Sequence, residues 1–404
     1  ILGFTCRVHS SFDLTKTVCV YVGCASLLIC LAFSEKKVVI PYCNYFIMSV
    51  LFTLLSLSLS TVFSINSWIS LKGAYLRYDG LFFNYSCIFI FFVIITFFKS
   101  IDIDNLVNVI VFSSIPVIIY AIAQGFNYDP YGWQATFGRF RVFSTFGHPA
   151  FFCAYVSMVI PLVYYKTLTS SKLYSILFVA LLSGLFLGRS RACFISFIIS
   201  TILFVFLLRK VIFKKYAITF WSALAVFAFV IAGFTINNES SLLKRFSQGS
   251  DRTQIYKTGL TIIRDYPVFG VGLDNVRSVY CYYFEPLKGI EKQCFPLIVN
   301  GGDELVSYYG HDKRILQQSR IHQDFLDVAC NRGLIGLASY VFLLYAYFRM
   351  AWRGCKDGDI LNISILCSVV AYLVQNQFSF GVQPIILLWW YLMGCTFVTS
   401  GNKK

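Results

Sequence analysis

The chain has 404 residues, of which 57% are hydrophobic and only 13% are charged. An ordinary soluble domain has about a quarter of its residues charged, so this composition excludes that class. The mean hydropathy of +0.69 favours a membrane protein instead. The formal net charge of +15 would suggest a nucleic-acid partner in a soluble protein, but here it has to be judged against the membrane topology.

Apolar segments of membrane-spanning length recur along the whole chain. A helix needs about 20 mostly apolar residues to cross the hydrocarbon core. These segments do not alternate as the strands of a membrane barrel do, so the sequence predicts an all-α, polytopic transmembrane bundle. The eleven predicted spans cover residues 17–34, 41–63, 81–98, 106–124, 149–165, 173–188, 192–208, 217–235, 333–349, 360–376 and 384–399.

The connections between the spans predict the orientation. The positive-inside tendency places the basic set of connections in the cytoplasm. That set comprises Lys36, Lys37, Lys99, Lys166, Lys172, Arg209, Lys210, Lys214, Lys215, Arg349, Arg353, Lys356, Lys403 and Lys404. The start at Ile1 would then face outward without a signal peptide, so we expect one further spanning helix upstream, twelve in all, in the native protein.

The predicted spans divide the chain into three parts. These are N-terminal transmembrane helices (1–235), an extracytoplasmic loop domain (236–332) and C-terminal transmembrane helices (333–404). Within the loop domain, we expect one helix from Arg252 to just before Pro267 and a second from Asp274 to about Phe284. Cys281 and Cys294 lie in this oxidising compartment and are a candidate disulfide pair.

The outward face is unusually basic. Of the 34 basic residues, 14 lie in the cytoplasmic set, which leaves 20 on the outward side. Two interpretations stay open: a large soluble loop with ordinary surface charge, or a face that handles an anionic substrate such as a lipid-linked phosphate.

Four outward segments place polar groups where the mouth of the bundle is expected. An arginine in a short hairpin near lipid depth is costly unless it snorkels or finds a partner, and its fork matches phosphate oxygens bidentately. Arg189 and Arg191 therefore either reach lipid headgroups or bind phosphate. The four segments are residues 73–80 with Arg77, 139–149 with Arg141 and His148, 188–191 with Arg189 and Arg191, and the loop domain with Arg252, Arg264, Arg320 and His322.

His322 stands between a polar cluster and an apolar helix. An imidazole that titrates near neutrality can accept a proton from a hydroxyl, so His322 is a candidate general base, and the alternative is a satisfied interfacial histidine. His148 precedes Pro149 and either caps the next helix or takes part in catalysis. Acidic pairs typical of divalent-metal sites occur at residues 102–104 and 357–359, on the predicted cytoplasmic side, and the outward acidic pairs are limited to Asp303 and Glu304 in a predicted loop. The sequence thus favours a reaction without a metal or other cofactor.

Five motifs in chain order resemble the O-antigen ligase superfamily. Residues 141–149, RVFSTFGHP, are similar to its arginine-then-TFGNPN signature, and residues 188–192, GRSRA, resemble its SRxA turn. Residues 252–272 resemble its R…W…P-hydrophobic-GxG block, and residues 322–336 its HNxxL…GxxG block. Residues 77–80, RYDG, fit its first outer loop. The chain departs at His148 and Ala150, where the family usually has asparagines.

The resemblance implies an inverting, metal-independent membrane glycosyltransferase of the GT-C type. Such enzymes move a glycan from undecaprenyl pyrophosphate to a hydroxyl acceptor on the outer face of the cytoplasmic membrane. Carried onto this chain, His322 matches the catalytic histidine, and Arg191 and Arg252 match arginines that hold the pyrophosphate. Further candidates are Arg189 and Arg141 for the pyrophosphate, and Arg77, Arg320, Arg264 and His148 for contacts with the acceptor or for support of the other residues.

Several partners and functions stay open. An O-antigen ligase uses lipid A-core as its acceptor, a polymerase uses a growing glycan, and a protein O-oligosaccharyltransferase uses a protein; nucleic acid is not expected. Acceptor recognition is expected in the loop 285–318. A transporter or flippase for a lipid-linked sugar is the alternative from another class, but it predicts ionisable residues in the middle of the spans, which are nearly absent.

Overall fold

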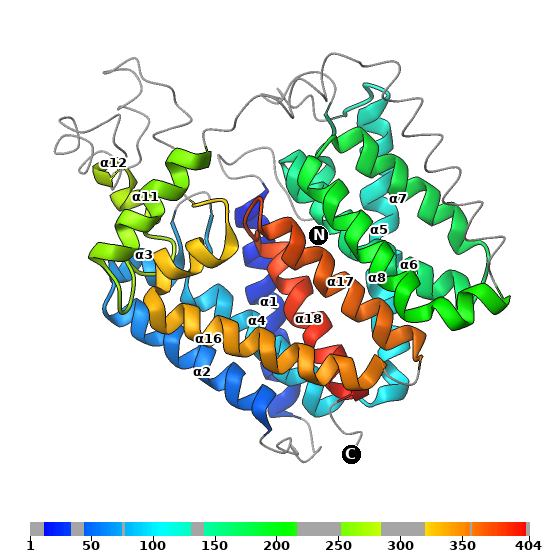
Figure 1. Ribbon diagram of the computed structural model, residues 1–404, viewed down its shortest axis with the longest axis horizontal. Helices are drawn as coiled ribbons and strands as arrows, with labels where there is room; N and C mark the ends of the chain where they lie inside the picture. Colours follow the sequence, from blue (N-terminus) through cyan, green and yellow to red (C-terminus); the bar gives the residue numbers. More distant parts are fainter. Residues whose placement is uncertain are drawn as a thin grey trace.

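The computed structural model describes residues 12–33, 44–74, 77–130, 141–215, 252–283, 320–355 and 358–400. Within these ranges all regular elements are helices and no strand occurs (Figure 1), so the predicted all-α polytopic fold is confirmed. Ten helices of the described ranges cover ten of the predicted spans, and the span at 217–235 lies outside these ranges. They are α1 (Asp13–Ala32), α2 (Tyr45–Val62), α4 (Leu81–Phe97), α5 (Ile103–Gly125), α6 (Pro149–Thr169), α7 (Tyr174–Gly188), α8 (Arg191–Lys215), α16 (Asp324–Cys355), α17 (Ile360–Asn376) and α18 (Gln383–Ser400).

Length and apolar composition alone qualify six described segments as membrane spans. The helices α4, α7 and α17 are apolar but shorter. The six segments are Asp13–Ala32, Tyr45–Val62, Ser100–Gly125, Pro149–Thr169, Arg191–Arg209 and Asp324–Cys355.

The bundle has two halves joined by α17 and α18. On one side α16 packs along α2 and α18 packs on α4, while on the other α6 contacts α7 and α8 (Figure 1). The helix α17 bridges the halves because it packs on α6 and α8 as well as on α18. The middle of α6 is buried on all of its faces, and Phe152 and Tyr155 are fully buried. This is expected for a helix enclosed by other helices.

The described part of the predicted loop domain sits at one end of the bundle. The predicted helices are confirmed as α11 (Arg252–Asp265) and α12 (Val276–Tyr283), which lie beside α3 (Ser67–Lys72) and the start of α16 (Figure 1). They share a small apolar core with residues on either side of His322, formed by Ile262, Val271, Val276, Val279, Tyr280, Ile321 and Cys330. The boundaries at 235/236 and 332/333 stay predictions, as does the Cys281–Cys294 pair, whose side chains lie outside the described residues.

The glycine motifs of the sequence form a docking point between this part and α16. Gly333 has φ +65° and interrupts α16, and the exposed amide of Leu334 donates to the carbonyl of Pro267 at 2.7 Å. The amides of Val271 and Gly272 donate to the carbonyls of Cys330 and Asn331 at 2.9 and 3.0 Å. Because the two backbones approach this closely, side chains at the glycines would collide.

Replacing Gly333 with alanine should destabilise the fold. An ideal Cβ there would lie 2.2 Å from the carbonyl oxygen of Val268, and the backbone, with φ +65° and ψ −169°, lies in a region nearly restricted to glycine that costs other residues about 1–3 kcal/mol. We expect a clear fall in the unfolding temperature of the detergent-solubilised protein. Gly23→Ala is the matched control, because nothing lies within 4 Å of a Cβ at Gly23 in α1. Equal unfolding temperatures for the two variants would contradict this account of the kink.

Acidic residues of the two metal-like pairs have structural partners in the described part of the chain. Asp104 pairs with the buried Lys166 at 2.5 Å. Asp102 accepts a hydrogen bond from the amide of Lys99 at 2.9 Å, and Asp359 caps the start of α17. These contacts explain the acids as helix caps and as an ion pair.

Candidate functional site

The chain turns sharply at His322, immediately before α16. Gln323 caps this helix: its side-chain oxygen accepts from the amide of Leu326 at 2.6 Å and its carbonyl from that of Asp327 at 2.8 Å. His322 itself has φ +59°, a left-handed conformation that is uncommon and strained for a residue with a side chain. Strain of this kind persists only where the surroundings hold it, and it often marks functional positions.

Two phenylalanine rings connect His322 with His148. The His322 ring meets that of Phe380, just before α18, at 4.9 Å and 70°. Phe380 contacts Phe151 in the first turn of α6 at 5.4 Å, and Phe151 contacts His148 at 4.8 Å. The guanidinium carbon of Arg77 lies 4.8 Å from the Phe380 centroid and 5.7 Å from that of Phe151. We call His148, Phe151, His322, Phe380 and Arg77 the histidine cluster.

His148 is held by the start of α6. Its Nδ1 accepts a hydrogen bond from the amide of Ala150 at 3.1 Å, so the capping role expected for it is confirmed. A neutral imidazole that accepts at Nδ1 carries its hydrogen on Nε2. The preceding turn is fixed from two sides, because Ser144 donates its amide to Gln124 at 2.8 Å and Lys16 donates to the carbonyl of Thr145 at 2.6 Å.

The electrostatic environment keeps both histidines neutral. Burial lowers the pKa of His322 to about 4, and the positive charges of Arg252 and Arg77 act in the same direction. Burial likewise lowers the pKa of His148 to about 4, with Arg141, Arg77 and His322 contributing. At neutral pH the two imidazoles are therefore available as a proton acceptor and a hydrogen-bond donor within a strongly positive surrounding.

The arginines predicted from the sequence differ in how they relate to this cluster. Arg252 begins α11, and its charge acts on His322. Arg141 donates to the carbonyls of Gly188 and Arg189 at 3.3 and 3.5 Å, which joins the segment before His148 to the turn between α7 and α8. Arg191 begins α8 in that same turn.

Two other candidates are engaged elsewhere. Arg264 lies at the other end of α11, where its side chain is 76% exposed and pairs with Asp265 at 3.0 Å. No contact among the described residues joins it to the histidine cluster. Arg320 is buried and forms ion pairs with three carboxylates, those of Asp79, Asp274 and Asp327.

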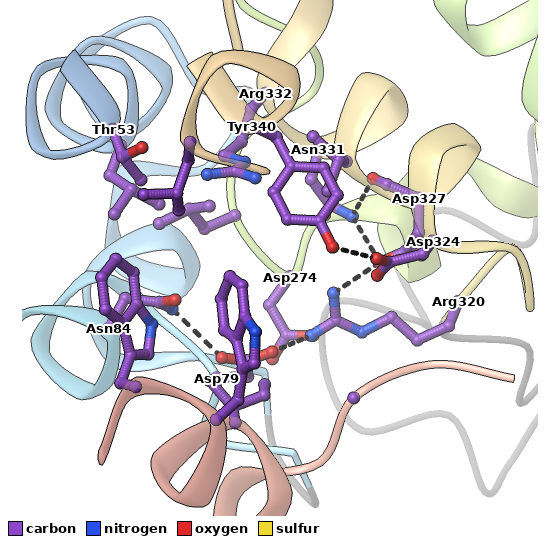
Figure 2. Close-up of a pocket in the computed structure, with 18 of the residues that line it drawn as sticks. Thr53, Asp79, Asn84, Asp274, Arg320, Asp324, Asp327, Asn331, Arg332 and Tyr340 are labelled. Atoms are coloured by element: carbon purple, nitrogen blue, oxygen red, sulfur yellow. Dashed lines mark hydrogen bonds and ion pairs between the residues drawn. The ribbon is translucent and has the colours of Figure 1, made fainter. Parts of the chain in front are cut away.

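A cavity of about 100 Å³ lies beside the ion pairs of Arg320. Its wall includes Asp324, which accepts a hydrogen bond from the hydroxyl of Tyr340, and Arg332, whose guanidinium carbon lies 5.9 Å from the Tyr340 ring (Figure 2). This acidic lining was not predicted as a set. The local signals were the placement of Asp79 before Gly80 and of Asp324 and Asp327 at the start of a helix that becomes apolar.

A comparison with known protein families gives a match that includes the turn before α8, the helix α11 and His322. Residues 176–341 match the family model described as O-antigen ligase. This chain carries an O-antigen ligase domain. The matched range of that domain contains Arg189, Arg191, Arg252 and His322, and a search of curated proteins finds no match.

The O-antigen ligase domain confirms the resemblance that the motifs indicated. Together with the apolar helices, it makes the chain a multi-pass bacterial membrane protein and a membrane glycosyltransferase of the ligase or polymerase type. Lipid-linked glycans are the substrates that this family implies.

Proposed function

We propose that the chain transfers a glycan from undecaprenyl pyrophosphate to a hydroxyl acceptor, as an O-antigen ligase of the inverting, metal-independent GT-C type. The observation that carries the proposal is His322, which is neutral and has a strained backbone. It lies in one cluster with Arg77, and the positive charge of Arg252 acts on it. A base beside several guanidiniums is what a transfer with an anionic leaving group requires.

The proposed reaction has one displacement step. His322 accepts the proton of the acceptor hydroxyl as its oxygen forms a bond to the anomeric carbon of the donor. The bond from that carbon to the pyrophosphate oxygen breaks, and the pyrophosphate leaves with the electron pair and its growing negative charge. Arg252 and Arg191, assisted by Arg189 and Arg141, hold that charge, because a guanidinium fork binds two phosphate oxygens at once. Attack opposite the leaving group inverts the anomeric carbon.

Reconstitution tests the transfer directly. Purified protein in liposomes, given an undecaprenyl pyrophosphate-linked glycan and lipid A-core, should produce glycosylated lipid A-core and free undecaprenyl pyrophosphate. The same glycan on undecaprenyl monophosphate should not react, because the leaving group is poorer, and chelators should have no effect. Failure with every acceptor, combined with movement of the donor across the bilayer, would support a lipid-linked sugar transporter instead.

The acceptor distinguishes the enzyme alternatives. A ligase adds one preformed chain to lipid A-core, whereas an O-antigen or exopolysaccharide polymerase produces a ladder of lengthened lipid-linked glycans, and a protein O-oligosaccharyltransferase modifies a hydroxyl of a protein. Gel analysis of products from the three acceptors decides among them. The proposed proton transfer from the acceptor hydroxyl to His322 is the same for all three acceptors.

We further propose that the protein lies in the bacterial inner membrane with the histidine cluster facing the periplasm or cell exterior. This orientation rests on the basic connections, which predict Arg353 to be cytoplasmic and Arg264 to be outside. In a cysteine-free background, an impermeant maleimide should label Arg264→Cys in intact cells and Arg353→Cys only after lysis. Both side chains are exposed, so access is not limiting, and the reverse labelling would contradict the orientation.

The pH dependence of transfer should report two different pKa values of His322. The base works when unprotonated, so kcat/KM, which reflects the free enzyme, should fall as the pH drops through about 4. The bound pyrophosphate places negative charge near the imidazole and favours its protonated form, which raises its pKa. The acid limb of kcat should therefore lie at a higher pH than that of kcat/KM. Coinciding limbs would contradict a pyrophosphate close to His322.

A further inference from the structure

Arg320 lies two residues before His322 and is the centre of a buried ion cluster. Its side chain reaches the carboxylates of Asp79 at 2.6 Å, Asp327 at 2.9 Å and Asp274 at 3.3 Å. Figure 2 shows its guanidinium between Asp79 and Asp274 on one side and Asp327 on the other. The residue is only 7% exposed, so these pairs are shielded from solvent.

The three carboxylates come from three separate segments of the chain. Asp79 lies between α3 and α4 and also accepts from the amide nitrogen of Asn84 at 3.1 Å. Asp274 precedes α12, and Asp327 lies in the first turn of α16. One guanidinium therefore joins the segment before α4, the segment before α12 and the start of α16, which are distant in sequence.

The same carboxylates also hold the backbone on both sides of the histidine cluster. Asp327 accepts from the amide of Ile321, the residue next to His322, at 3.0 Å. Asp274 accepts from the amide of Ala74 at 2.7 Å, and the carbonyl of Ala74 in turn accepts from the amide of Arg77 at 3.0 Å. The backbones that carry His322 and Arg77 are thus tied to a single arginine.

The charge balance indicates that the cluster fixes the positions of the segments that it joins more than it stabilises the folded protein. Three carboxylates and one guanidinium leave two negative charges in excess, and burial raises the pKa of Asp79 to about 6 although Arg320 opposes that rise. Buried ion pairs often contribute no more stability than apolar packing of the same volume, but removing one partner leaves charges uncompensated. A cluster of this kind defines a unique arrangement of the segments that it joins.

We propose that Arg320 is a positioning residue that, through Asp79, Asp274 and Asp327, sets how Arg77 and His322 lie across the ring of Phe380. The inference rests on the proposed function, because it assigns His322 as the base. Of the two roles expected for Arg320, it favours support of the other residues over contact with the acceptor, since the Nη1 and Nη2 atoms are bound to carboxylates. Arg320 acts on the reaction only through the residues that it places.

Arg320→Lys is the sharpest test, because it keeps the charge of the side chain but cannot reach all three carboxylates. If the segment of Arg77 loosens, the charge of Arg77 moves away from His322, and the pKa of His322 should rise from about 4 toward 6.5. The charge at position 320 is unchanged, so a rise indicates displaced Arg77. Among the described residues, the other charged or titratable groups near His322 include Arg252 and Tyr256 on α11 and His148 at the start of α6; the hydroxyl of Tyr256 donates to the carbonyl of His322 at 3.4 Å.

The titration is measured by NMR of protein labelled with ¹⁵N at histidine, with the His322 signal assigned by its loss in His322→Gln. Arg77→Met should raise the pKa of His322 by a similar amount, and the double variant with Arg320→Lys should add little. Asp79→Asn should change this titration little, because Asp79 is already protonated well below its pKa of about 6. Asp104→Asn, which breaks the ion pair with Lys166 elsewhere, should leave it unchanged.

Transfer kinetics provide the second measurement. Asp79→Asn and Arg320→Lys should lower kcat by about 10- to 100-fold, as misplacement by about 1 Å does, with little change in KM. For Arg320→Lys, a lower unfolding temperature with an unchanged His322 titration would reduce Arg320 to a structural role and overturn the inference. Because the titration needs no substrate, a wild-type protein without transfer activity would contradict the proposed function alone.

Discussion

Replacing His322 with alanine is expected to lower glycan transfer by about 100- to 10,000-fold, the contribution typical of a positioned general base. The physical reason is that no other described group of the histidine cluster can replace it. His148 uses Nδ1 to cap α6, and Arg77 stays protonated. Transfer is measured as glycosylated product per enzyme, and donor affinity as binding of the undecaprenyl pyrophosphate-linked glycan. Donor affinity should change only a few-fold.

A second substitution separates the lost base from the strained backbone. His322 has a left-handed conformation, which asparagine tolerates better than alanine does. His322→Asn should therefore restore stability relative to His322→Ala but not activity, because an amide cannot accept the proton. Full transfer by either variant would remove His322 from the reaction.

Arg252→Lys is expected to reduce kcat/KM by about 10- to 150-fold, which corresponds to the loss of a charged hydrogen bond of about 1.5–3 kcal/mol. Lysine keeps the charge but loses the fork that binds two phosphate oxygens. Arg191→Lys should behave in the same way. Affinity for an undecaprenyl chain that carries no phosphate should be the same for these variants and the wild type, since the arginines are proposed to contact only the pyrophosphate.

Arg264→Lys is the matched control on the same helix. Arg264 lies at the opposite end of α11 from Arg252, is exposed, and pairs with Asp265. Its replacement should leave kcat/KM within a few-fold of the wild type. A loss as large as that of Arg252→Lys would indicate that α11 tolerates no change of its arginines, and the specific role of Arg252 would then be wrong.

The sequence predicted most of the secondary structure correctly because the signal for a spanning helix is local. An apolar run of about 20 residues must form a helix in lipid, whatever lies beside it. The two helices of the loop domain were predicted for a similar reason, since the amphipathic pattern after Arg252 and the stop at Pro267 are both read along the chain. The family resemblance rested on ordered short motifs, and these are local as well.

The candidate site was predicted only in part. His322, Arg252 and His148 were singled out, but the contact between the two histidines through Phe151 and Phe380 was not, because apolar aromatic residues carry no distinguishing signal in a chain this rich in phenylalanine. The glycine motifs had indicated a turn and contributed to the family resemblance, but no contact between them was predicted. Their role in joining the segment of Gly270 to the kink at Gly333 depends on two backbones that meet only in the folded protein.

The sequence by itself determined the membrane-embedded helical bundle, its family and the candidate base, because burial in lipid and short motifs act over neighbouring residues. Only the tertiary structure decided what the charges do. From the sequence, Arg320 could contact the acceptor or support other residues, and the structure shows it bound to Asp79, Asp274 and Asp327. An ion pair depends on the distance between atoms from remote segments, and no pattern along the chain contains that distance.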